Sequence, residues 1–144
     1  SRIFSEPAVL RSVVPGANGV ATAGDLARFY AMMERKGSLD GAAVIQSATA
    51  EEAVEFQVEG VDKTTGAFAQ RSLGLALADA RMGKAAGDPL KTFGHGGAGS
   101  SYSWADPDSG VSFTYLTNCQ AEEPWHTVRL DQVSNLVHAA IIEP

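Results

Sequence analysis

The feature that most constrains the fold is the segment 92–118, in which a glycine-rich stretch leads into two runs separated by a turn. The turn, residues 106–110, contains a proline that fixes φ and a glycine that accepts positive φ. After the turn, every second side chain is large and apolar, which is the pattern of a strand with one apolar face. We therefore predict a β-hairpin with strands at residues 92–105 and 111–118.

Three other segments have apolar residues at helical spacing. The first is predicted to begin at the N-cap Thr22 and to stop at Gly37. Thr49 and Glu52 form a T-x-x-E capping box that predicts the start of the second. The third is predicted over residues 125–141, with its two histidines facing solvent. Its predicted apolar face consists of Trp125, Val128, Val133, Leu136, Val137, Ala140 and Ile141.

The remaining segments complete the expected fold. Residues 57–70 show no period and are predicted as a loop, whereas the alternation of Leu73, Leu75 and Leu77 predicts a strand at residues 71–78. The order of helices, strands and hairpin predicts an α+β fold, in which an antiparallel sheet packs against helices. We expect one domain over residues 1–144, because the chain contains no linker or repeat.

Charge and cysteine content exclude several classes of function. The formal net charge is −6, with 11 Lys and Arg against 17 Asp and Glu, so we expect no binding to nucleic acid or to a membrane. Cys119 is the only cysteine and the three histidines are scattered, so we expect no metal and no cofactor. No apolar run suits a signal peptide or a membrane helix, which favours a cytoplasmic location.

The glycine-rich segment 94–99 encloses His95 and admits more than one interpretation. It matches G-x-G-x-x-G, but a dinucleotide site needs a helix directly after that motif, and an extended pattern follows here. The simpler structural explanation is a strand whose glycines allow a close backbone approach. That explanation does not account for a histidine among the glycines.

Two segments together resemble the penicillin-recognising serine hydrolases, which include class C β-lactamases, penicillin-binding proteins and esterases of the same fold. The first is FGHGGAGSSYSWADPDSGVSFTYLTN, which resembles the third motif of that family and the hairpin after it. There, Lys, His or Trp is followed by a small residue and Gly, and His95-Gly96-Gly97 fits this pattern. The second is PGANGVATAGDLARFYAMMERKGSLDGAAVIQSATAEEAV, which resembles a helical segment upstream of that motif. The order of the two segments agrees with the family.

This resemblance implies an acyl-substrate site at the glycine-rich strand. His95, Gly96 and Gly97 would line the cleft, and the backbone N–H of Ala98 would be one donor of an oxyanion hole. The family also uses a Ser-x-x-Lys pair and a Tyr-x-Asn motif, and this chain contains neither. In the family both lie N-terminal to the matched segments. We therefore expect a C-terminal portion of a serine hydrolase for esters, β-lactams or D-Ala-peptides, inactive alone because no catalytic set is complete.

Two alternatives stay open at this point. One is a non-catalytic binding or interaction module derived from the same fold, and the other is an unrelated α+β enzyme that uses His95. As partner we expect a small-molecule acyl substrate, bound once an N-terminal part completes the site. Because only part of the family's sheet would be present, we also expect self-association as a homodimer or a domain-swapped oligomer.

Overall fold

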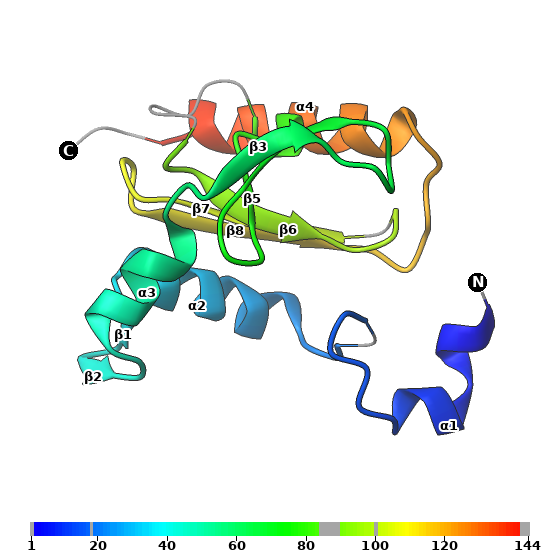
Figure 1. Ribbon diagram of the computed structural model, residues 1–144, viewed down its shortest axis with the longest axis horizontal. Coiled ribbons are helices and arrows are strands. Elements are labelled where there is room, and N and C mark those ends of the chain that lie inside the picture. The colour runs from blue at the N-terminus through cyan, green and yellow to red at the C-terminus, as the bar shows by residue number, and fades with distance from the viewer. Residues whose placement is uncertain (1, 18, 84–89, 100, 142–144) are drawn as a thin grey trace.

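A computed structural model describes residues 2–17, 19–83, 90–99 and 101–141. An antiparallel sheet lies between helices on its two faces (Figure 1). Helix α4 (Trp125–Ala139) covers one face, and helix α2 (Ala23–Glu34) packs on the other, against the last two strands. This arrangement confirms the predicted α+β class. None of the helices among the described residues combines the length and apolarity needed to span a bilayer.

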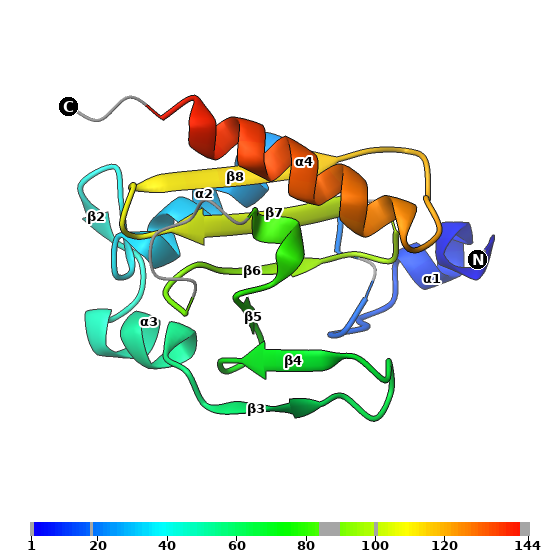
Figure 2. The same ribbon diagram turned by 90° about the horizontal axis from the view of Figure 1, so that it is seen from above.

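The strands of the main sheet lie side by side in chain order (Figure 2), and each pairs with the next in antiparallel orientation. They are β3 (Val58–Val61), β4 (Phe68–Arg71), β5 (Ala76–Leu77), β6 (Phe93–Gly96), β7 (Ser101–Asp106) and β8 (Val111–Leu116). The other elements are η1 (Arg2–Ser5), α1 (Pro7–Leu10), the paired strands β1 (Ser38–Leu39) and β2 (Ala42–Ala43), α3 (Ser47–Val54) and η2 (Ala80–Met82). The segment that holds η1 and α1 extends away from the sheet (Figure 1).

Helix α2 forms where its sequence predicts it. The N-cap Thr22 accepts a hydrogen bond from the backbone N–H of Asp25 at 3.1 Å, which satisfies a donor that the first turn leaves without a partner. Tyr30 and Met33 of the predicted apolar face are buried in the core beneath the sheet. Gly37 follows the helix with φ of 85°, a conformation that few residues other than glycine adopt.

Helix α3 starts earlier than its predicted capping box. Its N-cap is Gln46, and Thr49 and Glu52 both lie inside the helix, so the predicted box is wrong. Ala50 is completely buried against the core that contains Tyr30 and Met33. Helix α3 therefore begins at Ser47, ahead of the polar residues that suggested a start, and buries Ala50 within it.

Two predictions before the hairpin are also wrong. Residues 57–70, predicted as a loop, contain the antiparallel pair β3 and β4. Their apolar residues Val58, Val61 and Phe68 are exposed at the end of the sheet, so no alternating burial marks them in the sequence. The strand predicted at 71–78 is interrupted by a turn, because the N–H of Ser72 donates to the carbonyl of Leu75 at 3.1 Å.

The predicted turn of the hairpin is confirmed, but the strand predicted before it is two separate strands. Asp106 accepts hydrogen bonds from the N–H of Asp108 at 3.1 Å and from the Ser109 hydroxyl at 2.7 Å, and Gly110 has φ of 69°. The predicted continuous strand 92–105 is instead two strands, β6 and β7, which pair with each other. The glycines after β6 permit this additional reversal.

Helix α4 turns a different face to the sheet from the one predicted. The buried residues recur every fourth position, and they are His126, Leu130, Ser134 and His138. Trp125 and Leu136, which belong to the predicted apolar face, are each 71% exposed. The prediction that both histidines face solvent is therefore wrong.

Polar groups beneath α4 explain its orientation. The Trp104 indole N–H donates to Ser134 Oγ at 2.9 Å, and the Ser134 hydroxyl donates to the carbonyl of Arg81 at 2.8 Å. His138 Nε2 lies 2.9 Å from the carbonyl of Met82, and its ring stacks on Trp104 with centroids 4.5 Å apart. Buried polar groups need partners, so α4 presents the line of residues that supplies them.

Replacing Ser134 with alanine is expected to lower the free energy of unfolding by about 1–3 kcal/mol, because the buried Trp104 N–H and the Arg81 carbonyl both lose their partner. Urea denaturation followed by tryptophan fluorescence measures this change. Gln132→Ala, on the exposed side of the same helix, is the matched control and should change the stability by less than about 0.5 kcal/mol. Equal losses in both variants would contradict the assignment.

Candidate active site

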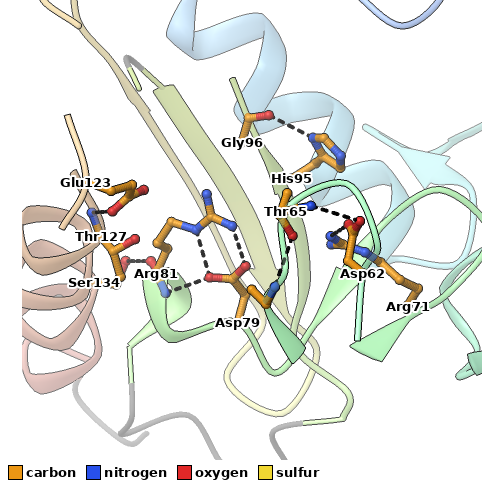
Figure 3. Close-up of polar contacts among 11 residues, drawn as sticks. Asp62, Thr65, Arg71, Asp79, Arg81, His95, Gly96, Glu123, Thr127 and Ser134 are labelled. Atoms are coloured by element: carbon orange, nitrogen blue, oxygen red, sulfur yellow. Dashed lines mark hydrogen bonds and ion pairs between the residues drawn. The ribbon is translucent and has the colours of Figure 1, made fainter. Parts of the chain in front are cut away.

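Strand β6 carries most of the residues that the sequence singled out, and it presents them to two different faces. His95 pairs with Ser103. Phe93, two residues earlier and so on the same face of the strand, packs with Tyr30 in the core on the α2 face. Gly94 and Gly96 pair with Trp104 and Tyr102, whose rings lie in the core on the α4 face. His95 therefore points to the α2 side of the sheet, as Figure 3 shows.

Gly94 and Gly96 are glycines because β7 lies very close to them. A Cβ atom on Gly94 would lie 2.9 Å from Trp104 Cα, and one on Gly96 would lie 2.7 Å from Cδ2 of Tyr102. Both separations are far shorter than a normal carbon–carbon contact. The close backbone approach suggested by the sequence therefore explains Gly94, whereas Gly96 makes room for the ring of Tyr102.

One side of β6 is open around His95. Strand β5 pairs only with Phe93 and Gly94, so from His95 onward no described strand lies beside β6 on that side. The His95 side chain is exposed, and its Nδ1 lies 2.8 Å from the carbonyl oxygen of Gly96. Since a carbonyl only accepts, Nδ1 carries the proton, and in the neutral ring the Nε2 lone pair faces outward.

The turn after β6 leaves one backbone donor exposed. The Gly97 N–H donates to the carbonyl of Ser101 at 3.0 Å, and the Gly97 carbonyl accepts from the Gly99 N–H at 2.8 Å. Ala98 between them is exposed, and among the residues that the structure describes none accepts a hydrogen bond from its N–H. The Ala98 N–H is thus available to an acceptor outside the described chain.

A segment after β8, residues 117–121, holds this turn in place. Gln120 Nε2 donates to the carbonyl of Ala98 at 3.1 Å, and the Ala121 N–H donates to the carbonyl of Gly99 at 2.8 Å. A Cβ atom on Gly99 would lie 2.6 Å from the Ala121 carbonyl, so a side chain at this position would force the two segments apart. Sequence reasoning did not find Gln120 or Ala121, because nothing local links them to the glycines.

The geometry decides the dinucleotide interpretation of this region. Strand β7 begins at Ser101, so the G-x-G-x-x-G match is followed by a strand and has no helix N-terminus for a pyrophosphate. The dinucleotide interpretation is therefore wrong. Within the described part of the chain, no group of three or more His, Cys, Asp or Glu side chains is arranged to hold a metal ion.

A second polar cluster, which sequence reasoning missed, lies on the α4 side. Arg81 donates to both carboxylate oxygens of Asp79, from Nε at 2.8 Å and from the terminal nitrogen at 2.6 Å. Its guanidinium carbon lies 4.8 Å from the centroid of the Tyr102 ring. Burial would raise the pKa of Asp79, but the hydrogen bonds from Arg81 outweigh it and hold that pKa below its usual value.

Buried rings near both sites have altered pKa values. Burial raises the pKa of Tyr30, beneath His95, to about 12, and it raises that of Tyr102 well above the usual value. Burial also lowers the pKa of His126, and the nearby cations Arg129 and Arg81 act in the same direction. Burial thus favours the neutral form of each of these rings.

A groove of about 600 Å³ adjoins the second cluster. Its walls come from the ends of β4 and β5, from η2 and from the start of α4, and they include Arg71, Asp79, Arg81, Glu123 and Thr127. Figure 3 shows Asp79 and Arg81 toward α4 and His95 beside α2. Arg81 and Asp79 satisfy each other, whereas the Ala98 N–H has no acceptor in the described part of the chain, so the glycine turn is the stronger candidate for chemistry.

Comparison with known proteins agrees with the fold. The family model described as Beta-lactamase matches residues 2–136. The chain is 32% identical over 119 residues to esterase/beta-lactamase LipL of Mycobacterium tuberculosis, a match that covers 81% of this chain and 26% of LipL. The chain therefore belongs to the beta-lactamase family, in agreement with its resemblance to the penicillin-recognising serine hydrolases. It spans about a quarter of the length of that curated relative.

Solved structures of similar fold lead to the same family. A penicillin-binding protein homologue from Caulobacter crescentus superposes with a TM-score of 0.77 at 31% identity, over 93% of this chain and 36% of that one. A family VIII carboxylesterase superposes with a TM-score of 0.61 at 25% identity, over 76% of this chain and 30% of that one. EstA from Arthrobacter nitroguajacolicus, at 22% identity and a TM-score of 0.70, shows the shared fold; the match covers 99% of this chain and 38% of EstA.

Gly94→Ala is expected to lower the free energy of unfolding by about 1–3 kcal/mol, because the added methyl group meets the backbone of β7. Thermal or urea unfolding measures the loss. Gly24→Ala in the first turn of α2 is the control, since the added methyl group would lie 3.8 Å from Thr22 Oγ1 and alanine favours a helix by about 0.5–1 kcal/mol. A Gly94→Ala protein as stable as the wild type would refute the packing explanation.

Proposed function

We propose that this chain is the C-terminal portion of a serine hydrolase that acts on esters, β-lactams or D-Ala-peptides. In this proposal it supplies the third motif, His95-Gly96-Gly97, and one wall of the oxyanion hole. Family membership supports the class of chemistry, and the names of the similar proteins include both esterase and β-lactamase. Because the chain spans only part of those proteins, the activity is assigned to a completed site.

The observation that carries this proposal is the exposed N–H of Ala98. It has no acceptor among the described residues, and it is held by a turn whose carbonyls are bonded to Gly99, Gln120 and Ala121. A donor fixed in this way needs no reorganisation when negative charge develops on a substrate carbonyl oxygen. Such preorganisation is what distinguishes an oxyanion donor from an ordinary loop amide.

His95 has a supporting role in the proposed site. Its ring is exposed on the α2 face, and the bond from Nδ1 to Gly96 leaves Nε2 able to accept a hydrogen bond from a substrate or from a neighbouring catalytic group. The open side of β6 begins at the same residue. An extended acyl group can therefore lie beside His95, Gly96 and Gly97 and reach the Ala98 N–H.

The nucleophile and its activating lysine are not in this chain, since it contains no Ser-x-x-Lys and no Tyr-x-Asn. That absence also favours a second candidate, a non-catalytic binding or interaction module derived from the same fold. The two candidates differ in what happens when the missing groups are supplied. A hydrolase portion gains activity that depends on Ala98, whereas a binding module gains none.

The isolated chain is expected to hydrolyse neither a chromogenic cephalosporin nor a small aryl ester above the buffer rate, because an oxyanion donor without a nucleophile forms no acyl-enzyme. A fluorophosphonate probe with mass-spectrometric detection is the more sensitive measurement. Stoichiometric labelling at one serine would overturn the assignment of an incomplete site.

A chimera tests the proposal directly. The segment 2–141 replaces the matched portion of the Caulobacter penicillin-binding protein homologue, and hydrolysis of the aryl ester is measured. Ala98→Pro, which removes the N–H, should lower kcat of an active chimera by roughly 10²–10³-fold with little change in KM. Ala98→Ser keeps the N–H and is the control. A folded but inactive chimera, or an Ala98→Pro chimera as active as the control, would argue against the oxyanion role.

A further inference from the structure

We propose that Gln120 is a positioning residue, which polarises the Ala98 N–H through a relay of two peptide groups. The inference rests on the proposed function, in which the Ala98 N–H is the oxyanion donor, and it adds a residue to that site. Gln120 does not itself contact the substrate in this proposal. It acts on the donor through hydrogen bonds within the turn at residues 97–99 and is joined to that turn from the segment after β8.

The relay begins at the side-chain amide of Gln120. Its Nε2 lies 3.1 Å from the carbonyl oxygen of Ala98. A carbonyl oxygen only accepts, so the NH₂ group of Gln120 faces Ala98 and its amide oxygen does not. This bond polarises the peptide group that joins Ala98 to Gly99, and the N–H of that peptide group becomes a stronger donor.

The second link is the hydrogen bond that spans Ala98. The Gly99 N–H donates to the carbonyl of Gly97 at 2.8 Å, a bond from residue i+2 to residue i of the kind that closes a γ-turn. The two groups that meet here belong to adjacent peptide planes. The Gly99 N–H shares its plane with the Ala98 carbonyl, and the Gly97 carbonyl shares its plane with the Ala98 N–H.

The direction of the relay follows from the geometry of these two trans peptide groups. In each plane the C=O and the N–H point in opposite directions, so a carbonyl that accepts on one side leaves an N–H that donates on the other. The dipoles therefore follow one another head to tail from Gln120 to the Ala98 N–H. Each bond in such a chain strengthens the next by about 10–30%. Gln120 thus makes the Ala98 N–H a better donor to an oxyanion than an isolated loop amide.

Backbone hydrogen bonds fix the shape of this turn independently of the Gln120 side chain. The Gly97 N–H donates to the carbonyl of Ser101 at 3.0 Å, and the Ala121 N–H donates to the carbonyl of Gly99 at 2.8 Å. Both bonds remain when the side chain of Gln120 is removed. Because that side chain is exposed and makes no part of the core, its loss weakens the donor without unfolding the turn.

Nuclear magnetic resonance of the 144-residue chain tests the relay without reference to catalysis. In Gln120→Ala, the amide protons of Ala98 and Gly99 should move upfield, because both lose polarisation. The amides of Gly97 and Ala121 should keep their protection from hydrogen exchange, because their bonds are unaffected. This combination separates a loss of polarisation from a loss of structure.

Gln70→Ala is the matched control for this measurement. Gln70 Nε2 donates to Glu59 Oε2 at the same distance of 3.1 Å, and it is also exposed, but its bond lies between β3 and β4. Its loss should leave the amide protons of Ala98 and Gly99 where they are in the wild type.

Gln120→Glu gives a readout that a purely structural role would not move. An ionised carboxylate only accepts, so it cannot donate to the Ala98 carbonyl, whereas a protonated carboxyl group can. The Ala98 amide proton should therefore move downfield as the pH falls through the usual range of a glutamate, around a pKa of about 4.3. Gln70→Glu should show no such titration at Ala98.

The catalytic consequence is measured in the chimera with the Caulobacter homologue. Gln120→Ala should lower kcat for the aryl ester by roughly 2–10-fold with little change in KM, because the donor is weakened and not removed. Ala98→Pro, which removes the donor, should cost roughly 10²–10³-fold in the same chimera. Gln70→Ala should leave kcat unchanged.

The outcomes distinguish failure of the relay from failure of the proposed function. Amide protons of Ala98 and Gly99 that do not move in Gln120→Ala would overturn the relay, and so would a loss of protection at Gly97, which would show that Gln120 fixes the shape of the turn. An active chimera that loses activity in Ala98→Pro but not in Gln120→Ala also overturns it. A chimera in which Ala98→Pro is as active as Ala98→Ser refutes the oxyanion role instead, and the amide shifts then decide the relay by themselves.

Discussion

The close approach of β6 and β7 is the constraint on which the rest of this structure depends. Tyr102 and Trp104 occupy the space that side chains on Gly94 and Gly96 would need, so the strands come together only because those two residues lack a Cβ atom. This packing places the Trp104 ring where its N–H meets Ser134 and its face meets His138. The position of α4 therefore depends on two glycines of β6, although β7 and β8 separate that strand from α4 in the sequence.

The same constraint separates the two faces of the sheet. On the α4 face, Arg81 is paired with Asp79 at the wall of the groove, the Trp104 N–H donates to Ser134, and His138 lies against the carbonyl of Met82. On the α2 face, the alternation of β6 turns His95 to the surface, and the turn beyond it exposes the Ala98 N–H. One run of glycines thus supports core packing on one side and a candidate reactive surface on the other.

Family membership and partial coverage together define what this chain contributes. It has the glycine strand, a turn held by residues 117–121, and the helices on both faces of the sheet. It has no Ser-x-x-Lys pair, and its sheet ends at an uncharged strand. The absence of the Ser-x-x-Lys pair is consistent with a chain that spans 26% of LipL and 36% of the Caulobacter homologue.

The sequence alone determined the features that arise from neighbouring residues. These are α2 with its Thr22 cap, the turn at residues 106–110, the α+β class, and the glycine motif around His95 in a chain that contains no Ser-x-x-Lys. Each depends on contacts within a few positions, where residue type limits the backbone directly. The β3–β4 pair escaped prediction because its apolar residues are exposed at an edge and leave no alternating pattern.

Only the tertiary structure decided which face of α4 is buried and how the candidate site is held. Ser134 meets Arg81 across 53 positions, His138 meets Met82 across 56, and Gln120 meets Ala98 across 22. Hydrophobic periodicity ranks the faces of a helix by apolar content, and by that measure His126, Ser134 and His138 belong outside. Ser134 and His138 are inside because their side chains meet the Trp104 N–H and the carbonyls of Arg81 and Met82, and a buried polar group that loses its partner destabilises the fold.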